Sequence, residues 1–208
     1  MTDLYGTNRD SPKGEPEGGR PGMVGLQAAE LNALLVRAEC LVDAVAMESA
    51  YDRLAAAIRA DLADRVPLVL VVMTGAVIAA GKLLPRLDFP LELDYLHATR
   101  YGEATSGGEL RWLARPRHSL AGRHVLVIDD IFDEGVTLKA IVEACHLEGA
   151  ASVRSAVPVN KLHGRKVAGF APDYIGIDVP DRFLVGEGMD YQGYFRNLNG
   201  IHALPDTP

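Results

Sequence analysis

The chain has 208 residues, of which 48% are hydrophobic and 24% are charged. This composition predicts one α/β domain with a sizeable core and little room for a second domain. The net charge of −7 and the isoelectric point of about 5.3 argue against a protein that binds nucleic acid or a membrane surface through bulk charge. The chain lacks an apolar signal core and any run of membrane-spanning length, so we expect a cytoplasmic protein.

The N-terminal part of the chain divides into two regions. Residues 1–25 are rich in glycine and proline and lack an apolar pattern, which predicts a disordered tail. Residues 26–64 carry two apolar stripes of helical period and predict two helices. Cys40 and Cys145 both lie in stretches of helical period, so we expect two reduced cysteines packed in the core.

From residue 66 onward, strands and helices alternate. The predicted strands are 66–73, 91–99, 110–114, 125–128, 153–159 and 174–179. The first is followed by a helix over 76–87, and the fourth by a helix that ends near residues 148–149. The segment 183–204 has a mixed composition with several aromatic residues and predicts no single element. This alternation predicts a mostly parallel twisted sheet flanked by helices on both faces.

The most specific pattern lies at residues 125–138. Four apolar residues precede the pair Asp129-Asp130, and a turn with the pattern D-x-G-x-T then opens a helix. Backbone N–H groups of residues 133–137 at a helix N-terminus suit a phosphate monoester. The two carboxylates suit the vicinal hydroxyls of a ribose. The alternatives are a Mg²⁺ site of a phosphatase or response regulator, or a purely structural connection.

Two further loops follow strands, and ligands of open parallel sheets bind beyond the carboxyl ends of strands. In Thr74-Gly75 the glycine usually serves only the turn, and a functional role for it depends on the fold. The nearby Gly81-Lys82 does not fit a nucleotide P-loop, because the spacing is wrong by one residue and Leu83 stands where Ser or Thr is needed. The polar, glycine-rich segment 100–109, with Arg100 and Tyr101 at its base, is an exposed hairpin tip or a lid that excludes water.

Three features nearer the C-terminus have a structural and a functional interpretation. Lys161 follows a strand, so it is either a solvated loop residue or a donor to a carbonyl oxygen. Phe183 is either a core residue or a platform for a flat base. Asp190 and Arg196 form a surface ion pair in the simplest interpretation.

Taken in order, these pieces resemble the hypoxanthine-guanine phosphoribosyltransferases over residues 66–202. The resemblance rests on the segment 125–138, on Val159-Asn160-Lys161, and on Asp181-Arg182-Phe183 with the segment 188–199. It implies the type I phosphoribosyltransferase fold, in one domain over 26–208. A small hood would form from the N-terminal helices and residues 180–204.

The resemblance also implies an activity. The enzyme would use Mg²⁺ to transfer the phosphoribosyl group of phosphoribosyl pyrophosphate (PRPP) to N9 of hypoxanthine or guanine, for purine salvage. Family members are dimers or tetramers. A xanthine-preferring enzyme and an RNA-binding regulator of the same fold are the alternatives, and the net charge argues against the regulator.

The resemblance assigns roles to individual residues. The residues implied to bind PRPP are Asp129, Asp130, Asp133, Glu134, Gly135, Val136, Thr137, Thr74, Gly75 and Arg196. The residues implied to lie at the purine are Lys161, which donates to O6, Phe183, which stacks, Leu184, through its backbone, and Asp190. Asp133 is the implied general base near N7, and Asp129, Asp130 and Asp190 are the implied Mg²⁺ ligands. Thr74 and Glu134 depart from the residues that many members have, which are Lys and Thr.

Overall fold

The computed structural model describes residues 27–100 and 110–205. The predicted tail at residues 1–25 and the tip of the predicted loop, residues 101–109 with Tyr101, lie outside the described residues. None of the helices in the described ranges combines the length and the apolar character needed to cross a membrane.

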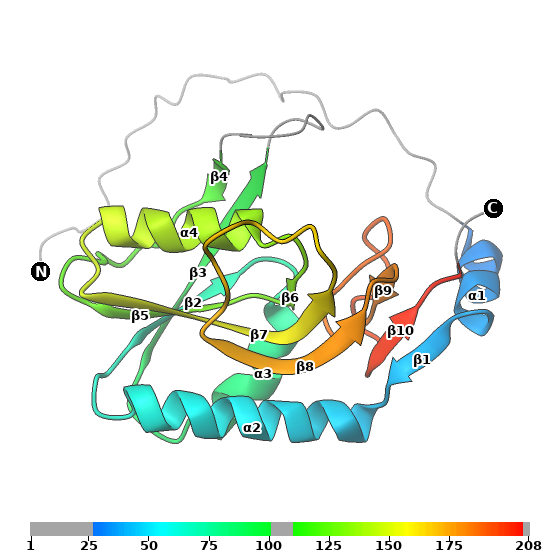
Figure 1. Cartoon of the computed structure of the whole chain (residues 1–208), viewed down its shortest axis with the longest axis horizontal. Coiled ribbons are helices and arrows are strands. Elements are labelled where there is room, and N and C mark those ends of the chain that lie inside the picture. Colours follow the sequence, from blue (N-terminus) through cyan, green and yellow to red (C-terminus); the bar gives the residue numbers. More distant parts are fainter. Residues whose placement is uncertain (1–26, 101–109, 206–208) are drawn as a thin grey trace, which may run out of the picture.

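A seven-stranded sheet forms the centre of the molecule (Figure 1). Its strands are β2 (Leu68–Val72), β3 (Glu92–Arg100), β4 (Leu110–Ala114), β5 (His124–Ile128), β6 (Ile131–Phe132), β7 (Ser152–Leu162) and β8 (Tyr174–Pro180). They run in the order β4-β3-β2-β5-β7, and β7 also pairs with β6 and β8. Every pairing is parallel except that of β3 with β4. The predicted mostly parallel sheet is confirmed.

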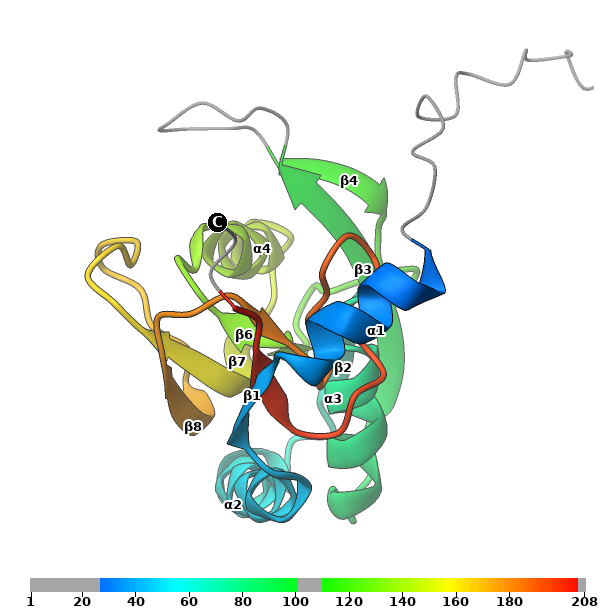
Figure 2. The same ribbon diagram turned by 90° about the vertical axis from the view of Figure 1, so that its right-hand side faces the viewer.

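Helices cover both faces of this sheet, also as predicted. The helices are α1 (Ala28–Val36), α2 (Ala44–Leu62), α3 (Val77–Leu83), which continues into the 3₁₀ turn η1 (Leu84–Arg86), and α4 (Val136–Leu147). Helices α2 and α3 lie on one face and α4 on the other (Figures 1 and 2). All five residues of β2 are buried, as are the last four of β5, because both strands lie between helix layers. The site at the strand ends therefore rests on the best-packed part of the core.

The segment 26–64 differs from the prediction of two helices alone. A strand, β1 (Glu39–Val42), lies between α1 and α2 and pairs with β10 (Ile201–Ala203). Strand β10 also pairs with β9 (Leu184–Val185), which gives a separate three-stranded antiparallel sheet. The partner of β1 comes from the far end of the chain, so no local pattern predicts this strand.

This strand overturns one prediction about the cysteines. Cys40 lies in β1 and is exposed, whereas Cys145 is buried in α4 as expected. Both are free thiols. The predicted helix over 76–87 is also shorter than expected, since it passes into a 3₁₀ turn that contains Pro85.

A buried glutamate ties the segment 183–200 to the helices below the sheet. Glu187 is fully buried, and its carboxylate accepts from Lys82 Nζ at 2.7 Å and from the Tyr51 hydroxyl at 3.1 Å. It also accepts from the Gly200 N–H at 2.9 Å. Because all the partners come from separate elements, this carboxylate links α2 and α3 to the chain that carries β9 and β10.

A second buried carboxylate, Asp94, holds the turn after β4 against β3. It accepts hydrogen bonds from the backbone N–H groups of Tyr95, Arg117 and His118, and its Oδ2 lies 2.8 Å from His118 Nδ1. Burial alone would raise the pKa of Asp94, but these hydrogen bonds outweigh burial and lower it from 3.8 to about 2.

We predict that Asp94 stabilises the fold in a pH-dependent way. Its pKa is lower in the folded state, so its contribution is complete above the unfolded pKa and is lost as the pH falls toward about 2. The shift corresponds to about 2 kcal/mol at neutral pH. In urea unfolding, Asp94→Asn should therefore be less stable than the wild type at pH 7, and the difference should narrow toward about pH 3. Asp64→Asn is the control, since that side chain is 90% exposed. A pH-independent difference for Asp94→Asn would contradict the prediction.

Candidate active site

The predicted site residues gather at the carboxyl edge of the parallel sheet. Val71 of β2 pairs with Ile128 of β5, and Ile128 pairs with Ala156 of β7, so the chain segments beyond these positions meet at one edge. They border a cavity of about 540 Å³. The predicted residues that line it are Thr74, Gly75, Asp129, Asp130, Asp133, Glu134, Gly135, Val136, Thr137, Asp190 and Arg196.

One wall of this cavity is the turn that opens α4. Gly135 precedes the helix with φ of 80°, and a side chain there would put a Cβ 2.0 Å from the ring of Phe132. The turn therefore requires glycine. The first N–H groups of any α-helix lack intrahelical partners, and this helix begins at Val136 without a side-chain cap to satisfy them. This end of the helix borders the cavity. This arrangement suits a phosphate.

Beside this turn lie the adjacent carboxyl groups of Asp129 and Asp130. Burial and the charge of Asp130 raise the pKa of Asp129 well above its ordinary value. Burial also raises the pKa of Asp130. The hydrogen bond from the Ile131 N–H and the charge of Arg196 lower this pKa, but burial has the larger effect. Two like charges at a buried strand end are costly, and hydroxyl donors or a cation would relieve that cost.

Three backbone segments approach one another closely at Asp130. A Cβ added to Gly75 would lie 2.1 Å from Asp130 Oδ2, and a Cβ added to Gly188 would lie 2.0 Å from the Gly75 carbonyl oxygen. Neither position has room for a side chain. The Met73–Thr74 peptide in this loop is cis. Glycine at these positions thus lets the β2 loop, the β5 loop and the segment 186–190 share one corner of the cavity.

A second, smaller cavity of about 230 Å³ adjoins the first. It is lined by the predicted residues Lys161, Phe183 and Leu184, with Met189. Phe183 is 51% exposed, so the interpretation as a core residue is wrong. Its ring lies nearly perpendicular to that of Tyr191, with 5.7 Å between the ring centroids. The two cavities share the residues Asp130, Ile131, Asp133 and Asp190.

Asp133 lies at the junction of the two cavities. Its Oδ2 accepts from Lys161 Nζ at 2.7 Å, and its Oδ1 lies 2.6 Å from His163 Nε2. Burial alone would raise the pKa of Asp133, but the hydrogen bonds from Lys161 and His163 outweigh burial and lower it. The register of β6 on β7, which pairs Phe132 with Asn160, explains why Asp133 and Lys161 are neighbours.

Lys161 and its neighbour His163 differ from what the sequence predicts. Strand β7 extends to Leu162, so Lys161 lies within the strand, and its side chain is only 12% exposed. It is not a solvated loop residue. His163 also contacts Asp133, and nothing in the sequence points to this role beyond its position two residues after Lys161.

Asp190 and Arg196 form the expected ion pair, but inside the cavity rather than on an open surface. Arg196 also donates to the Gly188 carbonyl oxygen. Arg165, which was not predicted, lines the same cavity and pairs with Asp181 at 2.7 Å. Arg100 ends β3, and its side chain is not described.

Similarity to known proteins agrees with this architecture. Residues 38–192 match the model of the phosphoribosyl transferase domain family. A hypoxanthine-guanine phosphoribosyltransferase of Bacillus subtilis (strain 168) is 34% identical over 165 residues, which cover 79% of this chain and 91% of that protein. A hypoxanthine-guanine-xanthine phosphoribosyltransferase of Tritrichomonas foetus is 34% identical over 144 residues, 69% of this chain and 79% of that protein.

A solved structure extends the similarity to three dimensions. A mutant of hypoxanthine phosphoribosyltransferase from Trypanosoma cruzi, in a ternary substrates complex, is similar with a TM-score of 0.76 and 30% identity. The match covers 82% of this chain and 97% of that chain. The family model spans most of the chain and the bacterial relative is matched over nearly its whole length, so this chain belongs to the phosphoribosyltransferase family, among the hypoxanthine-guanine phosphoribosyltransferases.

Proposed function

We propose that this enzyme transfers the 5-phosphoribosyl group of PRPP to N9 of hypoxanthine or guanine and releases pyrophosphate. The observation that carries the proposal is the pair of adjoining cavities with Asp133 between them. One has a phosphate-type turn and two carboxyl groups, and the other has a lysine and an exposed aromatic ring. A phosphorylated sugar and a flat base placed in the two cavities would meet at Asp133.

The larger cavity is proposed to bind PRPP. The N–H groups of residues 133–137 at the helix N-terminus would hold the 5′-phosphate, and Asp129 and Asp130 the ribose hydroxyls. Arg196, with the backbone at Thr74 and Gly75, would hold the pyrophosphate. Glu134 is exposed, and its carbonyl oxygen accepts from the Val167 N–H at 2.8 Å, so the departure from threonine leaves the turn intact.

Mg²⁺ fits the donor set of this cavity. Asp129 and Asp130 offer hard oxygen ligands whose mutual repulsion a cation would relieve. Within the described ranges, no group of three or more His, Cys, Asp or Glu side chains forms a ready metal cage. Mg²⁺ is usually bound by one or two carboxylates together with substrate phosphates, and not by a cage of protein side chains alone. Asp129 and Asp130 would hold one Mg²⁺ and Asp190 a second, and the metal would supply positive charge to neutralise the departing pyrophosphate.

The smaller cavity is proposed to bind the purine. Phe183 would stack on the base, and the backbone of Leu184 would meet its edge. Lys161 would donate to O6, and an adenine would be rejected because its 6-amino group is itself a donor. This requires Lys161 to exchange its bond to Asp133 for one to the base.

Asp133 is proposed to act as the general base. As N9 bonds to the anomeric carbon, the N7–H bond breaks and its proton passes to Asp133. The anomeric carbon is cationic in the transition state, and the nearby carboxylates would stabilise it. Protection of this carbon from water is the role proposed for the segment 100–109.

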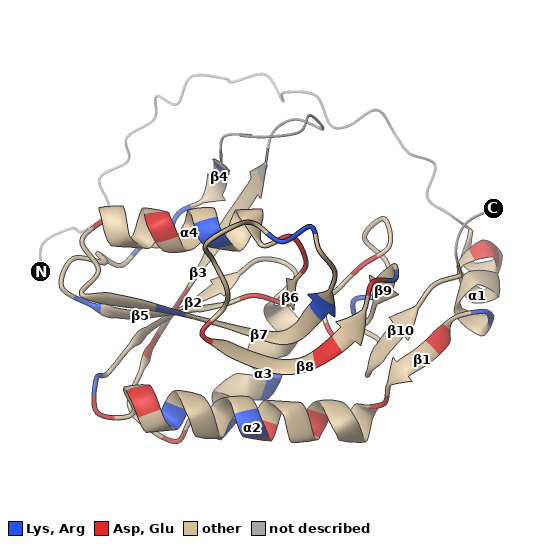
Figure 3. Ribbon diagram, viewed as in Figure 1, with Lys and Arg blue, Asp and Glu red and all other residues tan. Residues whose placement is uncertain are grey.

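Three further assignments stay predictions. The name of the Tritrichomonas relative includes xanthine, which favours testing that base as a substrate. A homodimer or homotetramer, a hood formed by the N-terminal helices and residues 180–204 within a domain over 26–208, and a cytoplasmic location follow from the family resemblance. Figure 3 supports an enzyme over an RNA-binding regulator, because side chains of both signs are interspersed along α2 and α4 and this view shows no continuous basic stripe among the described residues.

The proposal is tested by an assay of nucleotide formation with PRPP, Mg²⁺ and each of five bases: hypoxanthine, guanine, xanthine, adenine and uracil. We expect product with hypoxanthine or guanine and none with adenine or uracil. Product with adenine alone would contradict the proposed substrate class.

Asp133→Asn should lower kcat for hypoxanthine by about 10²- to 10⁴-fold, the usual contribution of a general base. Asparagine keeps the size of the side chain, so PRPP should bind as it does to the wild type. Single-turnover kinetics measure the chemical step and calorimetry the binding of PRPP. A variant with the wild-type kcat would exclude Asp133 as the base.

Lys161→Gln should lower kcat/KM for hypoxanthine about 10- to 100-fold, since a hydrogen bond from a charged donor is lost. Discrimination against adenine should fall at the same time, because glutamine can donate to or accept from position 6. Lys139→Gln on α4 is the matched control, since Lys139 contacts the Ala168 carbonyl oxygen and lines neither cavity. Unchanged kinetics with both purines would assign Lys161 a structural role only.

A further inference from the structure

His163 contacts Asp133, the proposed general base, and is far more buried than Asp133 itself. Its imidazole is 3% exposed, whereas the carboxylate of Asp133 that it contacts is 42% exposed. The contact between His163 Nε2 and Asp133 Oδ1 is 2.6 Å long. A buried, fixed group thus holds one oxygen of a carboxylate whose remaining surface faces the cavities.

The hydrogen bond on the far side of the imidazole decides which nitrogen carries the proton. The backbone N–H of Arg165 donates to His163 Nδ1 at 3.0 Å. An Nδ1 that accepts a hydrogen bond is unprotonated, so the proton of the neutral ring is on Nε2. His163 therefore donates to Asp133 Oδ1 as a neutral group and leaves the negative charge of the carboxylate in place.

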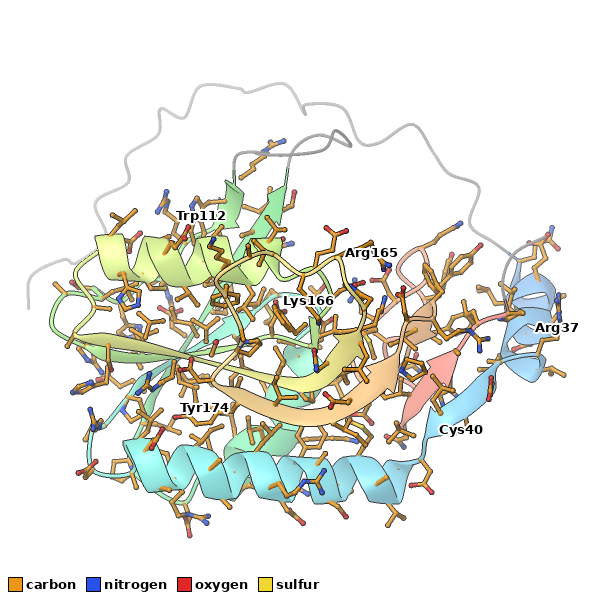
Figure 4. All side chains as sticks on the ribbon, in the orientation of Figure 1. Arg37, Cys40, Trp112, Arg165, Lys166 and Tyr174 are labelled. Carbon is orange, nitrogen blue, oxygen red and sulfur yellow. The ribbon has the colours of Figure 1, made fainter. Side chains whose placement is uncertain are left out.

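The chain around His163 is itself anchored to residues 132–134, just before the start of α4. Lys166, in the connection after β7 (Figure 4), donates through Nζ to the Phe132 carbonyl oxygen at 2.7 Å and lies 3.9 Å from the centre of the Phe132 ring. The Val167 N–H donates to the Glu134 carbonyl oxygen at 2.8 Å. The residues on both sides of Asp133 are thereby tied to the segment that carries His163, and the imidazole has little freedom to move away.

The two oxygens of Asp133 differ in how their partners are held. Oδ1 contacts the anchored imidazole, whereas Oδ2 contacts the amine of Lys161, which ends a long flexible side chain. Only the Lys161 contact can be exchanged for a contact to a base without moving the backbone. When it is exchanged, Oδ2 becomes the free oxygen and Oδ1 stays bound.

We propose that His163 is a positioning residue for the transfer reaction, which fixes Asp133 through Oδ1 so that Oδ2 faces the N7 proton. The proposal rests on the base role proposed for Asp133. In the step, the N7–H bond breaks and its proton passes to Oδ2, while its electron pair stays in the purine ring. N9 bonds to the anomeric carbon, and pyrophosphate leaves with the electron pair of the broken C–O bond. His163 exchanges no proton.

The test compares two polar variants that differ in reach. Glutamine places an amide N–H near the position of Nε2 and can still donate to Asp133, whereas asparagine is too short. His163→Asn should lower kcat about 10- to 100-fold, the loss expected for a hydrogen bond to a charged group. KM for PRPP should change little, and His163→Gln should recover most of kcat. His118→Asn is the control, since His118 pairs with Asp94 away from both cavities.

A double-mutant cycle separates this role from support of the fold. If His163 acts through Asp133, His163→Asn should cost nothing further in the Asp133→Asn background. Additive losses, equal losses in the Asn and Gln variants, or a wild-type kcat in His163→Asn would each overturn the proposal. A wild-type kcat in Asp133→Asn is a different result, since it would remove the proposed base and, with it, the partner of His163. Melting temperatures of all variants verify that each is folded.

Discussion

The carboxylate of Asp133 accepts one hydrogen bond on each oxygen, from Lys161 and His163. Both donors come from β7 or the residue just after it, and Asp133 comes directly after β6. Their meeting therefore depends on the parallel register of β6 on β7, in which Ile131 lies opposite Val159. A slip of one residue would turn Lys161 to the opposite face of the sheet. The hydrogen bond between Lys161 and Asp133, which links the two cavities, would then be lost.

The rest of the site is held by close contacts of glycine backbones with neighbouring side chains and with one another. Gly75 and Gly188 leave no space for a Cβ beside Asp130, and Gly135 leaves none beside Phe132. A loop that moved here would push against the buried strands β2 and β5, which are closely packed. The packing of these strands therefore restrains the loops. Rigid support matters here, because the adjacent carboxyl groups of Asp129 and Asp130 are unfavourable together until a substrate or cation binds.

Local sequence predicted the central sheet and most of the cavity lining, because those features lie in continuous segments. The apolar run of β5, the acidic pair and the glycine turn are consecutive, so their order alone places the strand, the carboxyl groups and the start of the helix next to one another. Strand β1 could not be predicted, since its partner β10 lies near the other end of the chain and its four residues lack a clear alternation. Cys40 was misplaced for the same reason.

Other features depend on distances that no pattern encodes. Asp94 is buried while its neighbours Leu93 and Tyr95 are exposed, the reverse of the usual polarity of a strand. His163 gained its contact to Asp133 because β7 ends just before it and the chain then turns back to the Glu134 carbonyl. A histidine in a polar connection gives no sign of that turn.

The most direct test of this account is the structure of the enzyme with Mg²⁺, an unreactive PRPP analogue and hypoxanthine. The decisive observation is the position of Lys161 Nζ. The account predicts that Nζ lies within hydrogen-bond distance of the purine O6 and has left Asp133 Oδ2, which faces N7, while His163 still contacts Oδ1. A bound purine with Lys161 still paired to Oδ2 would contradict it, since Lys161 would then make no contact with O6 and its ammonium would occupy the oxygen proposed to take the N7 proton.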